Sequence, residues 1–495
     1  MIKSLTKGEK IYFKKFSKRH VLGSGNKYVK LFEIINKSKN GYDENYVKKC
    51  FGNDKFINQI HVGKNYLFDL ILQALYEYHA DKDSETIINQ NLSKIRLLSE
   101  KNLNNAARKL LNKTKETSKV NFHYELLYKL LETEEYITAH EYSKNSMELL
   151  ERLNKEKHEA LENLRNVSLY KTLNNKLNII TSKWSYSNDP DFQEKILKIL
   201  EIPEVENESK AADYLSKLEL FRIKIKAYRF LLNDEKSLYY REKAVQLMEQ
   251  YPEVIKNYPE KYISRLYDFI NYALGTETGI SKNFKIESYL VKMKKSLDMV
   301  LNSRMSPAIK ALNWYYYFQM LIGYQYTVLN RDGFHNAILN FEREIELHTN
   351  YLRPRYLLNL YYYCIISFFE FKEYNNALVW QQKFINHKSA QQFEELFLTM
   401  LIVSVILHYE LENFELAESL IKKTSRYYKK KGFKNESGKI LISNLRMLNS
   451  AVKEDVNVIF KNLNEKLEIL ADKETEKRFL NSFNFRKWVI EKLKK

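Results

Sequence analysis

The chain has 495 residues, of which 44% are apolar, 14% aromatic and 29% charged. This apolar content can bury a large core, which excludes wholesale disorder, and the length predicts two or more domains or an elongated array. Glycine and proline number only 12 and 6, and residues 64–274 contain no glycine. Turn-rich β folds and phosphate-binding loops both need glycine, so the composition excludes them and predicts an all-α protein.

The formal net charge is +19, and most of the excess lies in two segments, residues 1–60 and 421–440. The two cysteines, Cys50 and Cys364, form no CxxC pair, which predicts a reducing compartment. The N-terminal sequence lacks the apolar core of a secretory signal, and the longest near-apolar run, 396–407, is shorter than the roughly 20 residues that cross a bilayer. We therefore expect a cytoplasmic protein without a membrane span, in which 396–407 is a buried helix.

Residues 1–80 are predicted to form a small basic helical domain. Thr6 and Glu9 have the T-x-x-E spacing of a capping box and open its first helix. A loop at 21–27, a helix at 27–38, a short helix capped by Asp43 and a longer helix at 64–80 are expected to follow.

Beyond residue 85 the pattern predicts helix pairs. Apolar stretches of about 12–20 residues alternate with polar breaks that can cap the next helix. These breaks are EKN, ETEE, NDEK, LNRDG, FKEY and LENF. The segment 184–210, which contains Pro190 and Pro203, is the predicted joint between two helical regions at 81–210 and 211–495, and 274–283 is a second irregular zone.

Several segments align on an alanine near the start of the second helix of a pair. Ala337, Ala377 and Ala417 are spaced by 40 residues, and Ala106 and Ala139 by 33. Antiparallel helices approach most closely near their turn, where a small side chain lets them touch. A larger apolar residue shortly before each alanine is expected to plug the turn: Leu103, Tyr136, Phe334, Tyr374 and Phe414.

Together with apolar residues one helix upstream (Leu97, Leu130 and Phe368), these positions make residues 85–150 and 310–432 resemble the tetratricopeptide repeat (TPR) family. The early tryptophan and the closing proline of the family are missing. The resemblance implies an α-solenoid whose first helices line a concave groove that binds a peptide or protein. It implies that the groove is lined by amide and aromatic side chains: Tyr124, Tyr128, Gln319, Tyr326, Asn330, Asn359, Tyr362 and Tyr409. Packing between repeats is the alternative role for each tyrosine.

Catalytic and metal-binding motifs are lacking. The histidines are scattered without an HExxH spacing, the glycine-containing loop at 23–27 neither follows a predicted strand nor leads into the GKS or GKT of a P-loop, and no GxSxG occurs. We therefore predict no metal, no cofactor and no enzymatic activity.

The basic segments are the other candidate site. The cations in question are Lys14, Lys15, Lys18, Arg19, Lys422, Lys423, Arg426, Lys429, Lys430 and Lys431. In the second cluster Tyr427 and Tyr428 are interleaved, a pattern that suits phosphate contacts with base stacking. The same charges can steer an acidic protein or peptide towards the chain, or simply form a solvated surface.

These features lead to one main hypothesis and two alternatives. The main hypothesis is a non-enzymatic scaffold that binds a protein or peptide, acidic in character, in the groove of the helical repeats. The first alternative is a helical repeat protein that binds nucleic acid through residues 1–60 and 421–440. The second is a regulator that senses a peptide in the groove.

Overall fold

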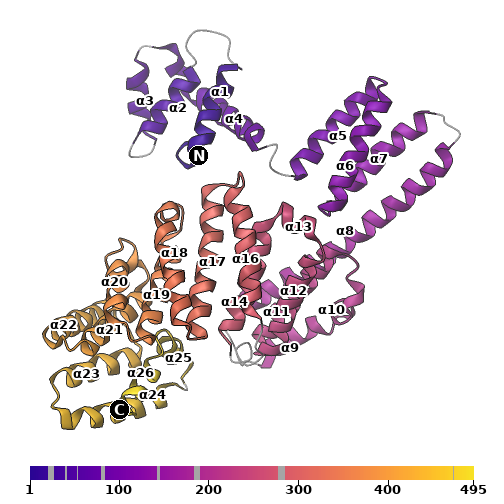
Figure 1. Cartoon of the computed structure of the whole chain (residues 1–495). Coiled ribbons are helices and arrows are strands. Elements are labelled where there is room, and N and C mark those ends of the chain that lie inside the picture. The colour runs from indigo at the N-terminus through magenta and orange to yellow at the C-terminus, as the bar shows by residue number, and fades with distance from the viewer. Residues whose placement is uncertain are drawn as a thin grey trace. The chain divides into compact units, whose positions relative to one another are not determined.

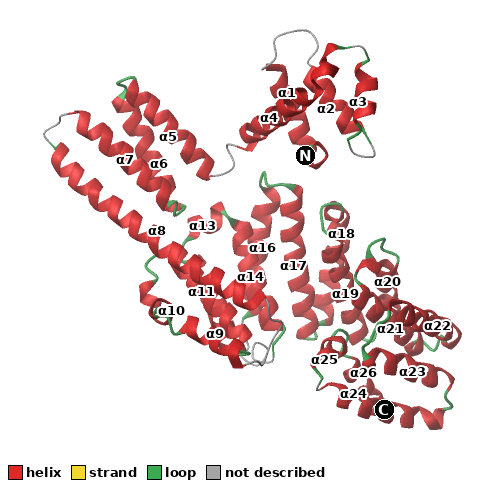
Figure 2. Ribbon diagram, turned by 180° about the vertical axis from the view of Figure 1, so that it is seen from behind, coloured by secondary structure: helices red, strands yellow, loops and turns green. Residues whose placement is uncertain are grey.

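The computed structural model describes residues 1–19, 27–38, 42–52, 54–79, 84–141, 145–182, 190–276, 285–471 and 473–494. Within these residues every regular element is a helix and none is a strand (Figure 2), which confirms the prediction of an all-α protein. The loop predicted at 21–27 and the irregular zone at 274–283 lie largely outside the described residues, as does the start of the joint predicted at 184–210.

The chain divides into two compact units. The first comprises residues 1–176 and 207–220, and the second comprises residues 177–206 and 221–495. The boundaries predicted at residues 80 and 210 stay predictions. The helices that begin in the first unit are α1 (Lys7–Arg19), α2 (Lys27–Lys37), α3 (Glu44–Phe51), α4 (Ile60–His79), α5 (Ser84–Glu100), α6 (Asn104–Val120), α7 (Tyr124–Glu141), α8 (Ser146–Ser182) and α11 (Tyr214–Phe230), with 3-10 turns at Ile2–Ser4, Lys55–Gln59 and Glu208–Lys210.

The second unit holds the remaining helices (Figure 1). They are α9 (Pro190–Leu200), α10 (Pro203–Glu206), α12 (Asp234–Glu249), α13 (Pro252–Asn257), α14 (Pro259–Leu274), α16 (Ile286–Asn302), α17 (Pro307–Thr327), α18 (Arg331–Thr349), α19 (Pro354–Glu370), α20 (Tyr374–Ile385), α21 (Glu394–Glu410), α22 (Phe414–Lys431), α23 (Glu436–Ser450), α24 (Lys453–Ala471), α25 (Glu474–Asn481) and α26 (Phe485–Leu493), with a 3-10 turn at Ala390–Gln392. The pairs α17–α18, α19–α20 and α21–α22 each pack together, and α17 also packs against both α14 and α19.

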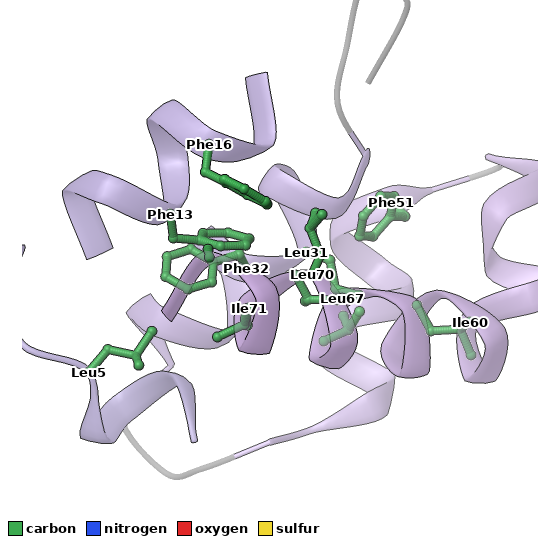
Figure 3. Close-up of a cluster of buried hydrophobic side chains, with 12 residues drawn as sticks. Leu5, Phe13, Phe16, Leu31, Phe32, Phe51, Ile60, Leu67, Leu70 and Ile71 are labelled. Carbon is green, nitrogen blue, oxygen red and sulfur yellow. The ribbon is translucent and has the colours of Figure 1, made fainter. Parts of the chain in front are cut away.

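Helices α1 to α4 share a hydrophobic core of their own (Figure 3). The predicted capping box opens α1, because the Glu9 amide donates to Thr6 Oγ1 at 3.3 Å and the Thr6 amide donates to Glu9 Oε2 at 2.7 Å. Asp43 caps α3 as predicted. The rings of Phe13 and Phe32 meet at a centroid distance of 4.5 Å. The buried members of this core are Leu5, Phe13, Phe16, Leu31, Phe32, Val47, Phe51, Ile60, Leu67, Leu70, Ile71 and Ala74.

One three-residue turn recurs between consecutive helices, and its middle residue has a positive φ although it is not glycine. These residues are Asn102, Phe122, Leu232, Leu329, Lys372 and Glu412. Each turn carries the two hydrogen bonds of a Schellman motif: the Lys372 amide donates to the carbonyl of Phe369, and the Glu373 amide to that of Phe368. The left-handed backbone costs an L-residue roughly 1–2 kcal/mol, so these turns are held by their hydrogen bonds and by the packing of the paired helices.

The turn also sets the register of the second helix. The residue five positions after the left-handed one is buried each time, and at most turns it is small: Ala107, Leu127, Ser237, Phe334, Ala377 and Ala417. Ala377 and Ala417 therefore lie where the sequence predicts them. Ala337 is buried one helical turn further along, and Phe334 holds the equivalent position.

The predictions for Ala106 and Ala139 are wrong. Ala106 is exposed and its neighbour Ala107 takes the buried position. Ala139 is exposed within α7, which runs without a break through the predicted turn at 132–135. The acidic run was mistaken for a helix start because Glu134 is a buried residue of a helix interior, where it pairs with Lys115 of α6 at 2.5 Å.

The predicted turn plugs are only partly confirmed. Phe334 is fully buried and Tyr374 is half-buried. Leu103, Tyr136 and Phe414 are exposed. The apolar run 396–407, in contrast, is a buried core helix as predicted: in α21 every side chain from Phe397 to His408 is buried.

We predict that Lys372→Gly raises the free energy of unfolding by about 1 kcal/mol, because glycine adopts a positive φ without a steric penalty. The matched control Lys423→Gly lies in the exposed interior of α22 and should lower it by about 1 kcal/mol. Urea denaturation of the two variants measures both effects. A loss of stability in both would contradict the role of the left-handed turn.

Candidate functional site

The last helices of the second unit lie against helices that come much earlier in the sequence. Figure 1 shows α25 and α26 next to α19 and α21. The hydroxyl of Tyr362 in α19 donates to the carbonyl oxygen of Ser482, and the Ser482 hydroxyl lies 3.1 Å from that of Thr399 in α21. Asn484 reverses the chain between α25 and α26 with a φ of 52°, a left-handed conformation that asparagine tolerates well. These contacts position α26 over the ends of α19 and α21.

Aromatic side chains anchor this segment. The buried Phe483 ring meets Phe369 of α19 edge-on, with centroids 4.8 Å apart. The buried indole of Trp488 lies 5.4 Å from Phe460 of α24 and 6.4 Å from Tyr409 of α21. Such ring pairs contribute about 0.5–1.5 kcal/mol each beyond the apolar area that they bury. Polar contacts add to these aromatic contacts of the segment.

A buried carboxylate provides the central polar contact. One oxygen of Glu410, the last residue of α21, accepts from the indole N–H of Trp488 at 2.8 Å, and the other pairs with the ammonium of Lys492 at 2.7 Å. The Glu410 side chain is only 4% exposed. Burial raises the pKa of the Tyr374 hydroxyl, and the neighbouring Glu410 carboxylate raises it further. A charge-assisted network of this kind is strengthened by its low-dielectric surroundings.

A second ion pair lies at the end of α19. Glu370 pairs with the ammonium of Lys487, whose side chain is 43% exposed. The space that remains between the two carboxylates and α26 is a cavity of about 40 Å³, and its lining includes Tyr326, Phe369 and Trp488. Such a space holds no more than a few water molecules. We call this site the Glu370–Glu410 pocket.

Three of the predicted groove residues lie at this pocket or contact the segment that covers it. Tyr326 lines it, Tyr362 holds the turn before α26, and Tyr409 packs on Trp488. They come from α17, α19 and α21, the first helices of successive pairs. Burial raises the pKa of each of these three hydroxyls. They therefore stay protonated and can act as hydrogen-bond donors.

The other predicted groove residues lie elsewhere. Gln319 is buried and accepts from the Tyr267 hydroxyl at 3.1 Å, and the Asn359 amide donates to the Tyr315 hydroxyl at 3.5 Å, so both tie neighbouring helices together. Asn330 caps α18 through the amide of Gly333. In the first unit, Tyr124 is buried in α7, and Tyr128 of the same helix packs on a core that includes Leu127 and Leu153.

The predicted basic residues form ion pairs in part. Lys14, Lys422 and Lys431 pair with Glu33, Glu418 and Glu394 at 2.8, 2.6 and 2.6 Å. Lys422 and Lys431 are nevertheless exposed, as are Lys15, Lys18, Lys423, Arg426, Lys429 and Lys430, and the side chain of Arg19 lies outside the described ones.

The tyrosines between these cations face inward. Tyr427 packs on Phe397 at a centroid distance of 5.1 Å, and Tyr428 donates to the carbonyl of Asn435 at 2.7 Å. Both side chains are half-buried, and the stacking of bases on them stays a prediction.

Sequence reasoning did not find the carboxylates Glu370 and Glu410 or their partners Lys487, Trp488 and Lys492. A signal was present at the C-terminal side: Trp488 is one of only 4 tryptophans, and Lys492 follows it at the i+4 spacing that places both on one helical face. No signal in the sequence joins this pair to Glu410, because the contact depends on the tertiary fold.

The described residues contain no group of three or more histidine, cysteine, aspartate or glutamate side chains placed to hold a metal ion. In the same part of the chain, no helix is both long and apolar enough to cross a membrane. Comparisons of the chain with protein-family models, with curated proteins and with solved structures found no match. At the Glu370–Glu410 pocket, aromatic rings and two carboxylates, of which Glu410 is buried, hold a helix.

We predict that Glu410→Ala lowers the free energy of unfolding by about 2–3 kcal/mol, because it leaves the buried indole N–H of Trp488 and the ammonium of Lys492 without their acceptor. The exposed Glu412 is the matched control, and Glu412→Ala should change stability by less than about 0.5 kcal/mol. Chemical denaturation followed by circular dichroism checks this difference. Equal stability of the two variants would show that α26 is not held by Glu410.

Proposed function

We propose that this protein is a non-enzymatic scaffold that binds a protein or peptide on a face formed by α17, α19 and α21, the first helices of a TPR-like array. The observation that carries the proposal is the Glu370–Glu410 pocket, where these helices hold α26 through aromatic rings and two carboxylates. A surface that accepts one amphipathic helix in this way has the chemistry of a helix-in-groove recognition site.

The arrangement of the first helices supports this proposal. Tyr267 of α14 stacks on Tyr316 of α17 at a centroid distance of 4.2 Å, and Tyr315 of α17 meets Tyr356 of α19 at 4.6 Å. These rings continue along the helices that lead to the pocket. Tyrosine offers an apolar ring and a polar hydroxyl at low conformational cost, which suits a surface that binds other chains.

The charge of the pocket favours a basic occupant. Glu370 and Glu410 both face cations of α26, and an acidic segment in the same place would meet like charges. The acidic partner expected from the net charge of +19 would instead use the exposed cations of α22. The pocket thus directs the proposal towards a basic segment of a partner protein.

Groove variants test the proposal by affinity capture from the native host. We expect Tyr326→Ala combined with Glu370→Ala to reduce recovery of the specific partner at least about fivefold, the effect of losing contacts worth about 1 kcal/mol. Tyr351→Ala combined with Glu346→Ala is the matched control, since both side chains are exposed at the end of α18, and recovery should not change. Equal recovery with both double variants would refute binding on this face.

A second candidate function, nucleic-acid binding, is favoured by the exposed cations of α22. Lys423, Arg426, Lys429 and Lys430 lie within two turns of one helix. In this second function, the cations of α22 would contact the phosphates of the nucleic acid and not its bases, because Tyr427 and Tyr428 pack inward.

For this second function we expect Lys423→Glu, Lys429→Glu and Lys430→Glu together to weaken binding of a labelled single-stranded oligonucleotide and to make it less salt-dependent. The slope of log K against log salt should fall by about 0.7 for each phosphate that the variant no longer neutralises. The matched control reverses Lys109, Lys113 and Lys155, which are exposed on α6 and α8. If both triple variants change binding alike, the α22 cations are not a specific site.

A further inference from the structure

We infer that the Glu370–Glu410 pocket is a docking site for a basic amphipathic helix in which a tryptophan is followed four residues later by a lysine, and that α26 occupies this site within the chain. The inference rests on the proposed function and names the class of partner segment. It goes beyond a generic groove because the contacts specify both the residue types and their spacing.

The spacing requirement comes from Glu410. Its two oxygens are used by two side chains of α26 one helical turn apart, the Trp488 indole at 2.8 Å and the Lys492 ammonium at 2.7 Å. Residues at i and i+4 share one face of a helix, so a helix with this pair satisfies both oxygens at once. A helix that lacks either group would leave a buried charge with one acceptor unused, which is costly at 4% exposure.

The charge requirement comes from the two carboxylates together. Glu370 pairs with Lys487, the residue that precedes Trp488, so the pattern read by the pocket is lysine–tryptophan followed by lysine. The rest of α26 and its flank carry Arg486 and Lys494 against a single acid, Glu491. A partner with this pattern is basic and aromatic, and its charge complements that of the pocket.

The pocket has room for one helix. With α26 in place only about 40 Å³ remains, so a partner segment and α26 exclude each other. Lys487 is half-exposed, so it can be substituted without changing a buried position. Reversing the charge of Lys487 and Lys492 removes both ion pairs of α26 and favours release of the whole helix, Trp488 included, so that the peptide can take its place against Phe460.

The experiment uses the full chain and a fluorescent peptide of residues 482–495. A loosened variant, Lys487→Glu with Lys492→Glu, places acids against Glu370 and Glu410 and should bind the peptide at least tenfold more tightly than the parent chain, measured by fluorescence anisotropy. A milder variant, Lys487→Ser with Lys492→Ser, repeats the measurement with less perturbation, and thermal melting confirms that each variant is folded.

Two controls test whether the increase in peptide affinity depends on the Glu370–Glu410 pocket. Adding Glu410→Gln to a loosened variant should reduce peptide affinity at least tenfold, whereas adding Glu412→Gln should leave it unchanged. A peptide in which the positions of Trp488 and Lys492 are both alanine should not bind any of the chains.

Failure to bind the peptide by both folded loosened variants would overturn the inference, and so would binding that Glu410→Gln leaves intact. A parent chain that is dimeric by light scattering and becomes monomeric with excess peptide would also overturn it, in favour of exchange of α26 between two copies. The proposed function is judged separately, because capture of a partner that depends on Tyr326 and Glu370 does not require that partner to carry the α26 pattern.

Discussion

Pairing of helices through a tight turn is the constraint on which the rest of this structure depends. Each recurring turn places a residue such as Leu329, Lys372 or Glu412 in the left-handed region. Two amide groups of the turn donate hydrogen bonds to carbonyl oxygens at the end of the preceding helix. The next helix then starts in a fixed register, and the residue five positions on is buried against its partner. Because the turn is the same each time, successive first helices present equivalent ends, and two of these ends supply Glu370 and Glu410.

The fold class follows from composition and local patterns, since a chain poor in glycine and rich in helical periodicity has few alternatives to helix pairs. The capping box at Thr6 and the cap at Asp43 are also local, and both are formed as predicted. Register is less local. Ala106 and Ala107 are equally suitable as small residues, and only the position of Asn102 in its turn decides that Ala107 is buried.

The site shows the same division between local and long-range information. Tyr326, Tyr362 and Tyr409 lie on α17, α19 and α21; Tyr326 lines the pocket, and the other two contact the segment that covers it. What fills the pocket could not be predicted, because α26 is a short helix whose own pattern says nothing of where it docks. The net charge of +19 was misleading for a related reason. It describes the chain as a whole, whereas the charges that contact α26 are two carboxylates, Glu370 and Glu410.

The distance along the chain between the pocket and α26 has a consequence for the order of folding. Tyr362 and Ser482 are 120 positions apart, and Lys487 and Glu370 are 117 apart, whereas the paired helices are joined by short turns. Closing a long loop lowers the chain entropy, and the contacts that offset this loss form only after the loop has closed. We therefore expect the helix pairs to form before α26 docks, so that the last tertiary contact to form in this region is the one that covers the Glu370–Glu410 pocket.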